Sequence, residues 1–260
     1  MSDSKDAVLI EKLGEHIALV TLNRPDKQNA INGEIARGLE AATEAIEADD
    51  NLRVAVLAAA GNKAFCAGAD LAAIAAGARD LSTRNGGFAG FVRAHRTKPW
   101  IAAIHGTAVG GGCELALACD MAVMADSAKI GLPEVKRGVL AAAGGAFRIG
   151  QILPRPIAIE MLLTGEPIGA DRALHFGLVN RVVPAQEVVT EALALAESIA
   201  ANAPLSVRES LTLVKLVQDC TEAELWERNT LSTKRVVGSE DAKEGPRAFL
   251  EKRQPQWKGR

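Results

Sequence analysis

Apolar residues along this chain form short continuous runs that alternate with stretches of helical periodicity. Asn32 suits the N-cap of a helix whose apolar face begins at Ile35, and further helices are predicted over Cys113–Cys119 and Ile168–Leu178. This alternation of strands and helices predicts an α/β fold with parallel strand pairing. The predicted strands are Val8–Ile10, Ile17–Leu22, Val54–Ala58, Trp100–Ile104, Met121–Met124 and Val179–Val183.

From about Pro184 the pattern becomes helical throughout. We therefore divide the chain into a core over residues 1–200, which carries the candidate site, and a helical C-terminal region over residues 201–260. The segment Ser82–Gly90 is either a surface connection or a mobile loop beside the glycine-rich region. The helices predicted after Pro184 are Ala185–Ala201, Leu205–Gln218, Glu222–Val237 and a short one within Glu240–Arg253.

Composition narrows the class of protein. With 48% hydrophobic residues, a net charge of −2 and no apolar run near the roughly 18 residues of a membrane helix, we expect neither nucleic-acid nor membrane partners. The start, MSDSKDAVLIEKLG, is unlike a signal peptide, which favours a cytoplasmic location. The 4 cysteines are scattered without ligand spacing, so we expect reduced thiols and no metal site. The absence of tyrosine excludes a tyrosine acid.

The most informative segment joins a predicted strand to a predicted helix through Gly110–Gly112. The first N–H groups of a helix have no internal partner, so these glycines can present donors to a phosphate or to a thioester oxyanion. A turn required only for packing is the other interpretation. The segment does not match a dinucleotide fingerprint or a P-loop, and the chain has no G-x-S-x-G motif.

Two glutamates are candidates for chemistry. Glu114 enters an otherwise apolar helix, where it is either a functional carboxyl or a first-turn residue stabilised by the helix dipole. Glu134 follows Pro133 and is either a surface acid or a second carboxyl of the same site. Two carboxyls in one apolar pocket would provide general acid–base catalysis. His105 is either structural or a ligand contact, and Asp120 is expected to cap or pair.

Four segments together resemble the crotonase family, also called the enoyl-CoA hydratase/isomerase superfamily. They are AFCAGAD at Ala64–Asp70, IAAIHGTAVGGGCELALACD at Ile101–Asp120, GLPE at Gly131–Glu134 and LTGEPIGADRALHFGLVNRVV at Leu163–Val183. The resemblance covers essentially the whole chain. It implies a spiral of ββα units and a C-terminal helical region that packs trimers, often paired into hexamers.

The resemblance also implies an acyl-CoA thioester as substrate, with CoA as part of that substrate and no separate cofactor. It implies an oxyanion hole formed by the peptide N–H groups of Ala69 and Gly111. The C-terminal Phe249 and Lys252 would reach CoA, in one arrangement across a subunit boundary. The remaining residues that it assigns to CoA or substrate binding are Lys27, Ala64, Ala67, Gly68, Asp70 and Leu71.

Hydratases of this family carry both glutamates, so the resemblance implies reversible syn hydration of a 2-enoyl-CoA. Glu114 would deprotonate the water that attacks C3, and Glu134 would supply the proton that reaches C2. Leu132 stands where typical short-chain hydratases have glutamine, and with Gly86–Phe91 it resembles carnitinyl-CoA dehydratase-like members. That dehydratase (crotonobetainyl-CoA hydratase) reaction, enoyl-CoA isomerisation and a non-catalytic acyl-CoA-binding role stay open as alternatives. The aromatic candidates for lining a quaternary ammonium acyl group are Phe88, Phe91, Trp100 and Phe147.

Overall fold

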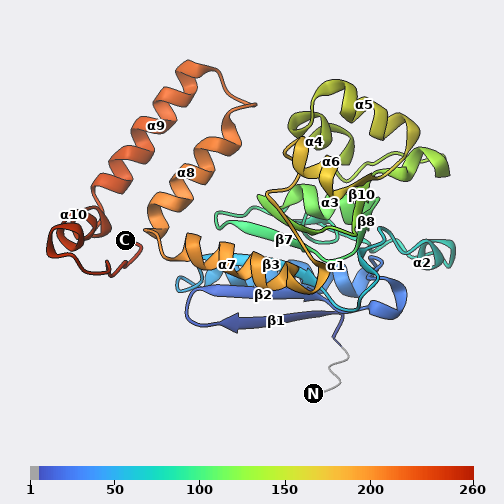
Figure 1. Ribbon diagram of the computed structural model, residues 1–260, viewed down its shortest axis with the longest axis horizontal. Coiled ribbons are helices and arrows are strands. Elements are labelled where there is room, and N and C mark those ends of the chain that lie inside the picture. Colours follow the sequence, from blue (N-terminus) through green and yellow to red (C-terminus); the bar gives the residue numbers. More distant parts are fainter. Residues whose placement is uncertain (1–5) are drawn as a thin grey trace.

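A large, mainly parallel sheet forms the centre of the protein (Figure 1). The computed structural model describes residues 6–260. The strand order is β1-β2-β3-β7-β9-β12, and only β1 and β2 pair antiparallel. The strands are β1 (Val8–Leu13), β2 (Ile17–Leu22), β3 (Val54–Ala59), β7 (Trp100–Ile104), β9 (Met121–Ala125) and β12 (Arg181–Val183). The predicted α/β class is confirmed.

A second, smaller sheet has the order β11-β10-β8-β4, with strands β11 (Ile168–Gly169), β10 (Lys129–Gly131), β8 (Thr107–Val109) and β4 (Ala64–Cys66). Successive units place one strand in the large sheet and the next in the small sheet before a helix follows. Thus β3 and β4 precede α2 (Leu71–Ala75), and β7 and β8 precede α3 (Gly111–Ala118). This arrangement is the expected spiral of ββα units.

The helices that cover the large sheet follow the sequence pattern closely. In α1 (Gly33–Ala48) the Asn32 side chain accepts a hydrogen bond from the Ile35 N–H, so the predicted cap is confirmed. Helix α7 (Val188–Ala200), after η3 (Ala185–Glu187), packs against β3, β7 and β9. The remaining elements of the core are η1 (Pro25–Lys27), η2 (Pro133–Arg137), α4 (Gly145–Ile152), α5 (Arg155–Thr164) and α6 (Ala170–His175).

Two expectations about local structure need correction. The helix predicted over Ile168–Leu178 spans only Ala170–His175, because Ile168 and Gly169 pair with β10 as strand β11. The segment Ser82–Gly90 forms a hairpin of β5 (Ser82–Thr83) and β6 (Gly87–Phe88). A strand pairing made with a distant segment overrides local helical periodicity at such short elements.

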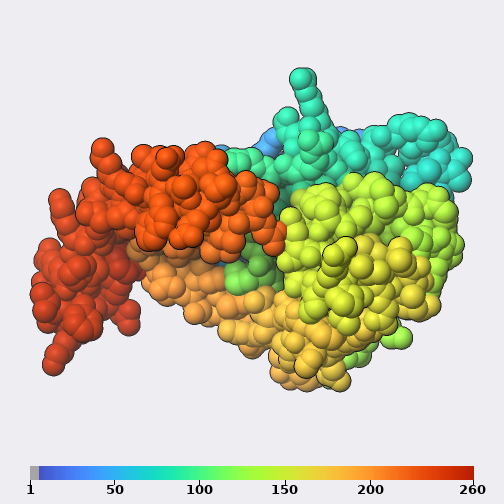
Figure 2. Space-filling view, turned by 90° about the horizontal axis from the view of Figure 1, so that it is seen from above, coloured from blue at the N-terminus to red at the C-terminus, as the bar shows by residue number. Residues whose placement is uncertain are grey.

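The C-terminal helices project from one end of the core, as Figures 1 and 2 show. They are α8 (Pro204–Leu216), α9 (Glu222–Val237) and α10 (Asp241–Glu251), and α9 packs against both of the others. Trp226 and Val214 on these helices are largely exposed. The division of the chain at residue 200 stays a prediction, and residues 1–5 of its first part lie outside the described residues.

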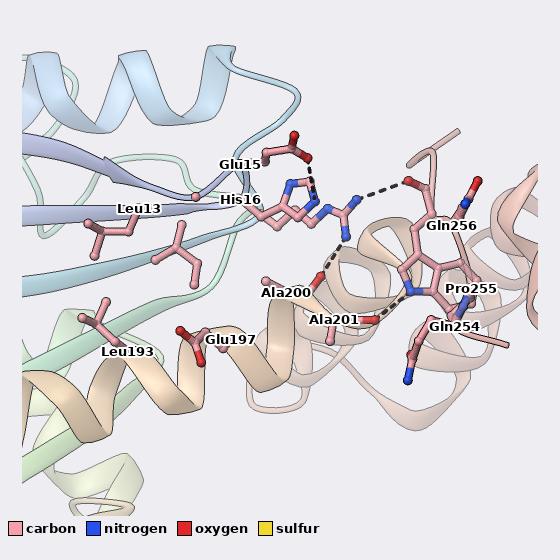
Figure 3. Close-up of a pocket in the computed structure, with 14 residues that line it drawn as sticks. Leu13, Glu15, His16, Leu193, Glu197, Ala200, Ala201, Gln254, Pro255 and Gln256 are labelled. Carbon is pink, nitrogen blue, oxygen red and sulfur yellow. Dashed lines mark hydrogen bonds and ion pairs between the residues drawn. The ribbon is translucent and has the colours of Figure 1, made fainter.

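The chain after α10 returns to the core and closes a cleft beside the end of α7 (Figure 3). The Arg53 guanidinium donates hydrogen bonds to the carbonyl oxygens of Ala200 and Trp257, at 2.8 and 3.2 Å. The Trp257 indole N–H donates to the carbonyl of Ala201. None of the candidate site residues lines this cleft. Within residues 6–260, no helix has the length and apolar character needed to cross a membrane.

A buried lysine ties the end of α1 to the core. The Lys98 side chain is 1% exposed, and its ammonium donates hydrogen bonds to the carbonyls of Ile46, Glu47 and Asp49. Lys98→Met is expected to lower the free energy of unfolding by about 2–3 kcal/mol, because it leaves buried acceptors without donors. Urea denaturation measures this. Lys12→Met, which breaks an exposed ion pair with Asp49, should cost under about 1 kcal/mol. Equal costs for the two variants would contradict this account.

Candidate active site

The candidate residues gather where three neighbouring parallel strands of the small sheet end. Strand β8 pairs with β4 on one side and with β10 on the other. The carboxyl ends of parallel strands meet at one edge of a sheet. Ala69 follows β4, Gly111 and Glu114 follow β8, and Glu134 follows β10. The topology therefore brings together segments that are far apart in the sequence.

Two peptide N–H groups face the same space at this edge. Ile31 forms a parallel bridge with Ala69, in which Ile31 donates to the Gly68 carbonyl and accepts from the Asp70 N–H. Ala69 lies between these partners, so its own N–H points away from Ile31. Gly111 is the first residue of α3, where the N–H has no partner within the helix. The arrangement fits a pair of donors for a developing negative charge.

Glycine is required at this edge because the backbones of the two segments approach closely. At Gly68, where φ is +92°, a Cβ would lie 3.0 Å from the Gly111 nitrogen. At Gly112 a Cβ would lie 2.0 Å from the carbonyl oxygen of Cys66. The glycines are therefore required for close packing. This requirement is compatible with the other interpretation, in which their N–H groups bind an anion.

Glu114 is buried and held by backbone donors. It is 4% exposed, and its Oε1 accepts a hydrogen bond from the Gly145 N–H at 2.9 Å. Burial raises the pKa of this carboxyl, and the charge of Glu134 raises it further. Hydrogen bonds from the Gly145 and Ala143 peptides and the charge of Arg148 oppose that rise in pKa.

Glu134 projects towards the same space from η2. Its Oε1 lies against Gly110, where a Cβ would be 3.5 Å away. Its Oε2 is buried and receives no hydrogen bond from the part of the chain that the structure describes. Burial raises the pKa of this carboxyl as well. A buried acceptor of this kind can hold a polar substrate atom or exchange a proton with it.

Several residues assigned to CoA lie close to the two donors. Ala64 is buried in β4 and Ala67 is half-buried, and both are tied to the segment after η1: the Ala64 carbonyl accepts from the Asn29 amide, and the Ala67 N–H donates to Gln28. Asp70 caps α2 and forms a 3.1 Å ion pair with Arg24.

The other assigned residues are exposed. Leu71 begins α2 with 62% of its surface exposed, and Lys27 ends η1 on the surface. Phe249 and Lys252 lie at the end of α10, remote in the fold from α3 (Figure 1). The structure therefore does not bring these two C-terminal residues to the glutamates of their own chain.

Only one of the four aromatic candidates lies beside the donors. A Cβ at Gly111 would lie 2.6 Å from the Phe88 ring, so Phe88 packs directly against the backbone of Gly111. Phe91 and Trp100 pack edge-to-face in the core, at a centroid distance of 4.9 Å, with no exposed surface. Phe147 is 60% exposed on α4. Phe91 and Trp100 are therefore excluded as lining residues, whereas Phe88 lies against Gly111 and the Phe147 ring lies near Gly144.

The structure also gives the surroundings of Asp120 and His105. Asp120 accepts a hydrogen bond from the Trp100 N–H and pairs with Lys215, which confirms its structural role. Burial lowers the pKa of His105, so its imidazole favours the neutral form. Leu132 is buried and packs against Gly145, next to Glu114.

Sequence reasoning missed the residues that hold the site in shape. These are Asn29, which bridges the carbonyls of Ala60 and Ala64, and Arg148 with the Gly144–Gly145 pair before it. A glycine pair followed by an arginine was the available signal for the second group. Nothing in the sequence around Asn29 indicated which carbonyls it would reach.

A ββα spiral with the carboxyls of Glu114 and Glu134 close to the glycine-rich start of α3 has the features of the crotonase fold. The family described as enoyl-CoA hydratase/isomerase matches residues 12–260, and the chain belongs to that family. It is 43% identical over 250 residues to a carnitinyl-CoA dehydratase of Proteus mirabilis, covering 93% of this chain and 94% of that one.

Solved structures give the same result. An enoyl-CoA hydratase from Mycobacterium tuberculosis superposes with a TM-score of 0.95 at 39% identity, covering 98% of this chain and 100% of that one. A carnitinyl-CoA hydratase from Mycobacterium avium superposes with a TM-score of 0.78 at 47% identity, covering 99% and 100%.

Proposed function

We propose that this protein is an enoyl-CoA hydratase, a hydro-lyase that adds water reversibly and with syn geometry to a 2-enoyl-CoA thioester. The observation that carries the proposal is the convergence of Glu114 and Glu134 beside Gly111, at the shared edge of β8 and β10. The names of the relatives, which are hydratases and dehydratases of CoA esters, support the same reaction.

In the proposed reaction, the thioester oxygen accepts hydrogen bonds from the N–H groups of Ala69 and Gly111. Glu114 removes one proton from a water molecule while the water oxygen bonds to C3. The electron pair of the C2–C3 double bond moves towards the thioester, and the two N–H groups stabilise the enolate oxygen. Glu134 then gives its proton to C2, so that one water has been added across the double bond.

This sequence of steps requires one proton on the carboxyl pair. Donors from Gly145 and Ala143 favour the carboxylate form of Glu114, whereas Oε2 of Glu134 is buried without such a donor among the described residues. The charge of Glu134 also raises the pKa of Glu114, so the protonation states of the two carboxyls are linked. We assign the shared proton to Glu134 in the direction of hydration.

The rest of the assignment follows the family pattern. Ala64, Ala67 and Gly68 would hold CoA near the donors, with Asp70, Leu71 and Lys27 around them and no cofactor besides the substrate. We propose a homotrimer, alone or paired into a hexamer, in which Phe249 and Lys252 reach the CoA of a neighbouring subunit. The distance of α10 from α3 within one chain supports that arrangement (Figure 1). A cytoplasmic location stays a prediction.

One alternative reaction has a specific observation in its favour. Relatives named carnitinyl-CoA dehydratase or hydratase reach 43% and 47% identity. Leu132 packs beside Glu114, at the position where we expect glutamine in a short-chain hydratase. A quaternary ammonium acyl group is recognised best by several aromatic faces, and among the four aromatic candidates only Phe88 packs against Gly111. Isomerisation and a non-catalytic binding role have no comparable support.

A hydration assay tests the proposal directly. Purified protein is expected to remove the absorbance of the conjugated enoyl thioester when mixed with crotonyl-CoA, a longer 2-enoyl-CoA or a ring-bearing enoyl-CoA. Crotonobetainyl-CoA is the fourth substrate, and its rank decides between the two hydratase assignments. Binding of all four esters without any loss of absorbance would contradict hydration and direct the search to isomerisation or thioester hydrolysis.

A further inference from the structure

A half-buried arginine contacts the loop that holds Glu114. Arg148, on α4, donates hydrogen bonds through Nη1 to the carbonyl of Ala143, at 3.1 Å, and through Nη2 to the carbonyl of Val92, at 2.6 Å. It borders the groove between the core and α8. No step of the proposed hydration uses this side chain directly.

Arg148 and Glu114 both lie against the Gly144–Gly145 pair. A Cβ at Gly144 would lie 2.3 Å from Arg148 Nη1, and a Cβ at Gly145 would lie 3.0 Å from Glu114 Oε1. The guanidinium and the carboxylate therefore approach adjacent residues of the same short segment. Gly144 adopts φ +103°, a conformation that side chains rarely allow.

We propose that Arg148 is a positioning residue for Glu114. By binding the Ala143 carbonyl, it fixes the peptide groups of residues 143–145 so that their N–H groups face the Glu114 carboxylate. Its permanent positive charge also favours the charged form of Glu114. The inference rests on the proposed function, because it concerns the base of that reaction.

The second hydrogen bond of Arg148 extends its reach to the acyl side of the site. Val92 follows the β5–β6 hairpin, which carries Phe88 against Gly111. The Arg148 guanidinium thus connects the loop that holds Glu114 to the segment that follows the β5–β6 hairpin. A planar group with fixed donor directions can hold two carbonyls in this way, whereas a lysine ammonium holds them less rigidly.

Arg96 provides a matched control. It too donates to two backbone carbonyls, those of Phe91 and Ala118, and burial lowers its pKa as it does for Arg148. Within the part of the chain that the structure describes, its hydrogen bonds do not involve residues 143–145. The charged groups that act on Glu114 are Glu134 from η2 and Arg148 from α4, and neighbouring Cys113 stays a neutral thiol because its pKa is raised. Arg96 acts on Arg148 through its charge but is not among the groups that shift the pKa of Glu114, so its loss measures the cost of removing a similarly bound arginine.

The experiment compares Arg148→Gln, Arg148→Lys and Arg96→Gln. Arg148→Gln is expected to lower kcat for hydration by up to about 10²-fold with little change in KM, because the base is misplaced while CoA binding is intact. Loss of the cation raises the pKa of Glu114, so a smaller fraction is carboxylate at a given pH. The acidic limb of the kcat/KM profile should therefore move to higher pH. Arg148→Lys should restore the position of the limb but not the full kcat.

A titration of ¹³C-labelled glutamate carboxyls by NMR reports the pKa of Glu114 without turnover, with Glu114→Gln identifying its signal. Arg148→Gln should raise that pKa and Arg96→Gln should leave it in place. An unchanged Glu114 titration in Arg148→Gln, or an equal loss of kcat with unchanged pH profiles in both arginine variants, would overturn the proposal. If the unmodified protein hydrates no enoyl-CoA, the proposed function fails, but the titration still decides whether Arg148 controls Glu114.

Discussion

Glu134→Gln should lower kcat for the hydration of a 2-enoyl-CoA by about 10²–10⁴-fold, the range expected when a general acid is removed. Glutamine keeps the shape of the side chain but cannot give a proton to C2. The buried Oε2 has no donor within the described residues, so the substitution breaks no hydrogen bond to that atom. Steady-state rates measured on the best of the four candidate substrates give the result.

Stability separates a catalytic role from a structural one. Because burial raises the pKa of Glu134, its ionised form is unfavourable in the fold, and Glu134→Gln should leave the free energy of unfolding unchanged or raise it. Glu166→Gln is the control. Glu166 is exposed, and within the described residues it forms an ion pair with Lys136, which belongs to η2 as Glu134 does. Activity close to that of the unmodified protein in both Glu134→Gln and Glu114→Gln would show that the site is assigned wrongly.

The strands and the two glutamates were accessible from the sequence because their signals are local. The runs that became β3 and β7 are fully apolar, as expected for strands covered on both faces. Glu114 stood out because the residues that follow it are all apolar, and the structure shows that every residue of α3 is buried. A charged residue in such a helix needs a partner, and that requirement is visible without coordinates.

The features that required coordinates depend on which distant segments meet. The N–H direction of Ala69 is set by its bridge to Ile31, and no pattern near Ala69 indicates that bridge. The hairpin that places Phe88 against Gly111 is built from two short strands in a segment that resembled a loop. The sequence alone identifies Arg148 as a charged residue of an amphipathic helix. Only the fold shows that it binds the loop that holds Glu114.

Gly68→Ala is expected to lower kcat by about 10²–10³-fold, the cost of losing one donor of an oxyanion hole. The added methyl group would lie 3.0 Å from the Gly111 nitrogen and equally close to the Val109 carbonyl, so the start of α3 must shift away from Ala69. The two donors then no longer converge on one oxygen. Substrate binding should weaken less than kcat falls, because the loss concerns charge that develops in the transition state.

Gly77→Ala separates this effect from backbone strain. Gly77 has φ +94°, against +92° for Gly68, and a Cβ there would meet nothing within 4 Å. Both variants place a side chain in a left-handed conformation, which costs about 1–2 kcal/mol of stability as measured by urea denaturation. If the donors act as proposed, only Gly68→Ala also loses activity. A comparable loss of kcat in both variants would mean that strain, and not the position of the Gly111 N–H, limits the reaction.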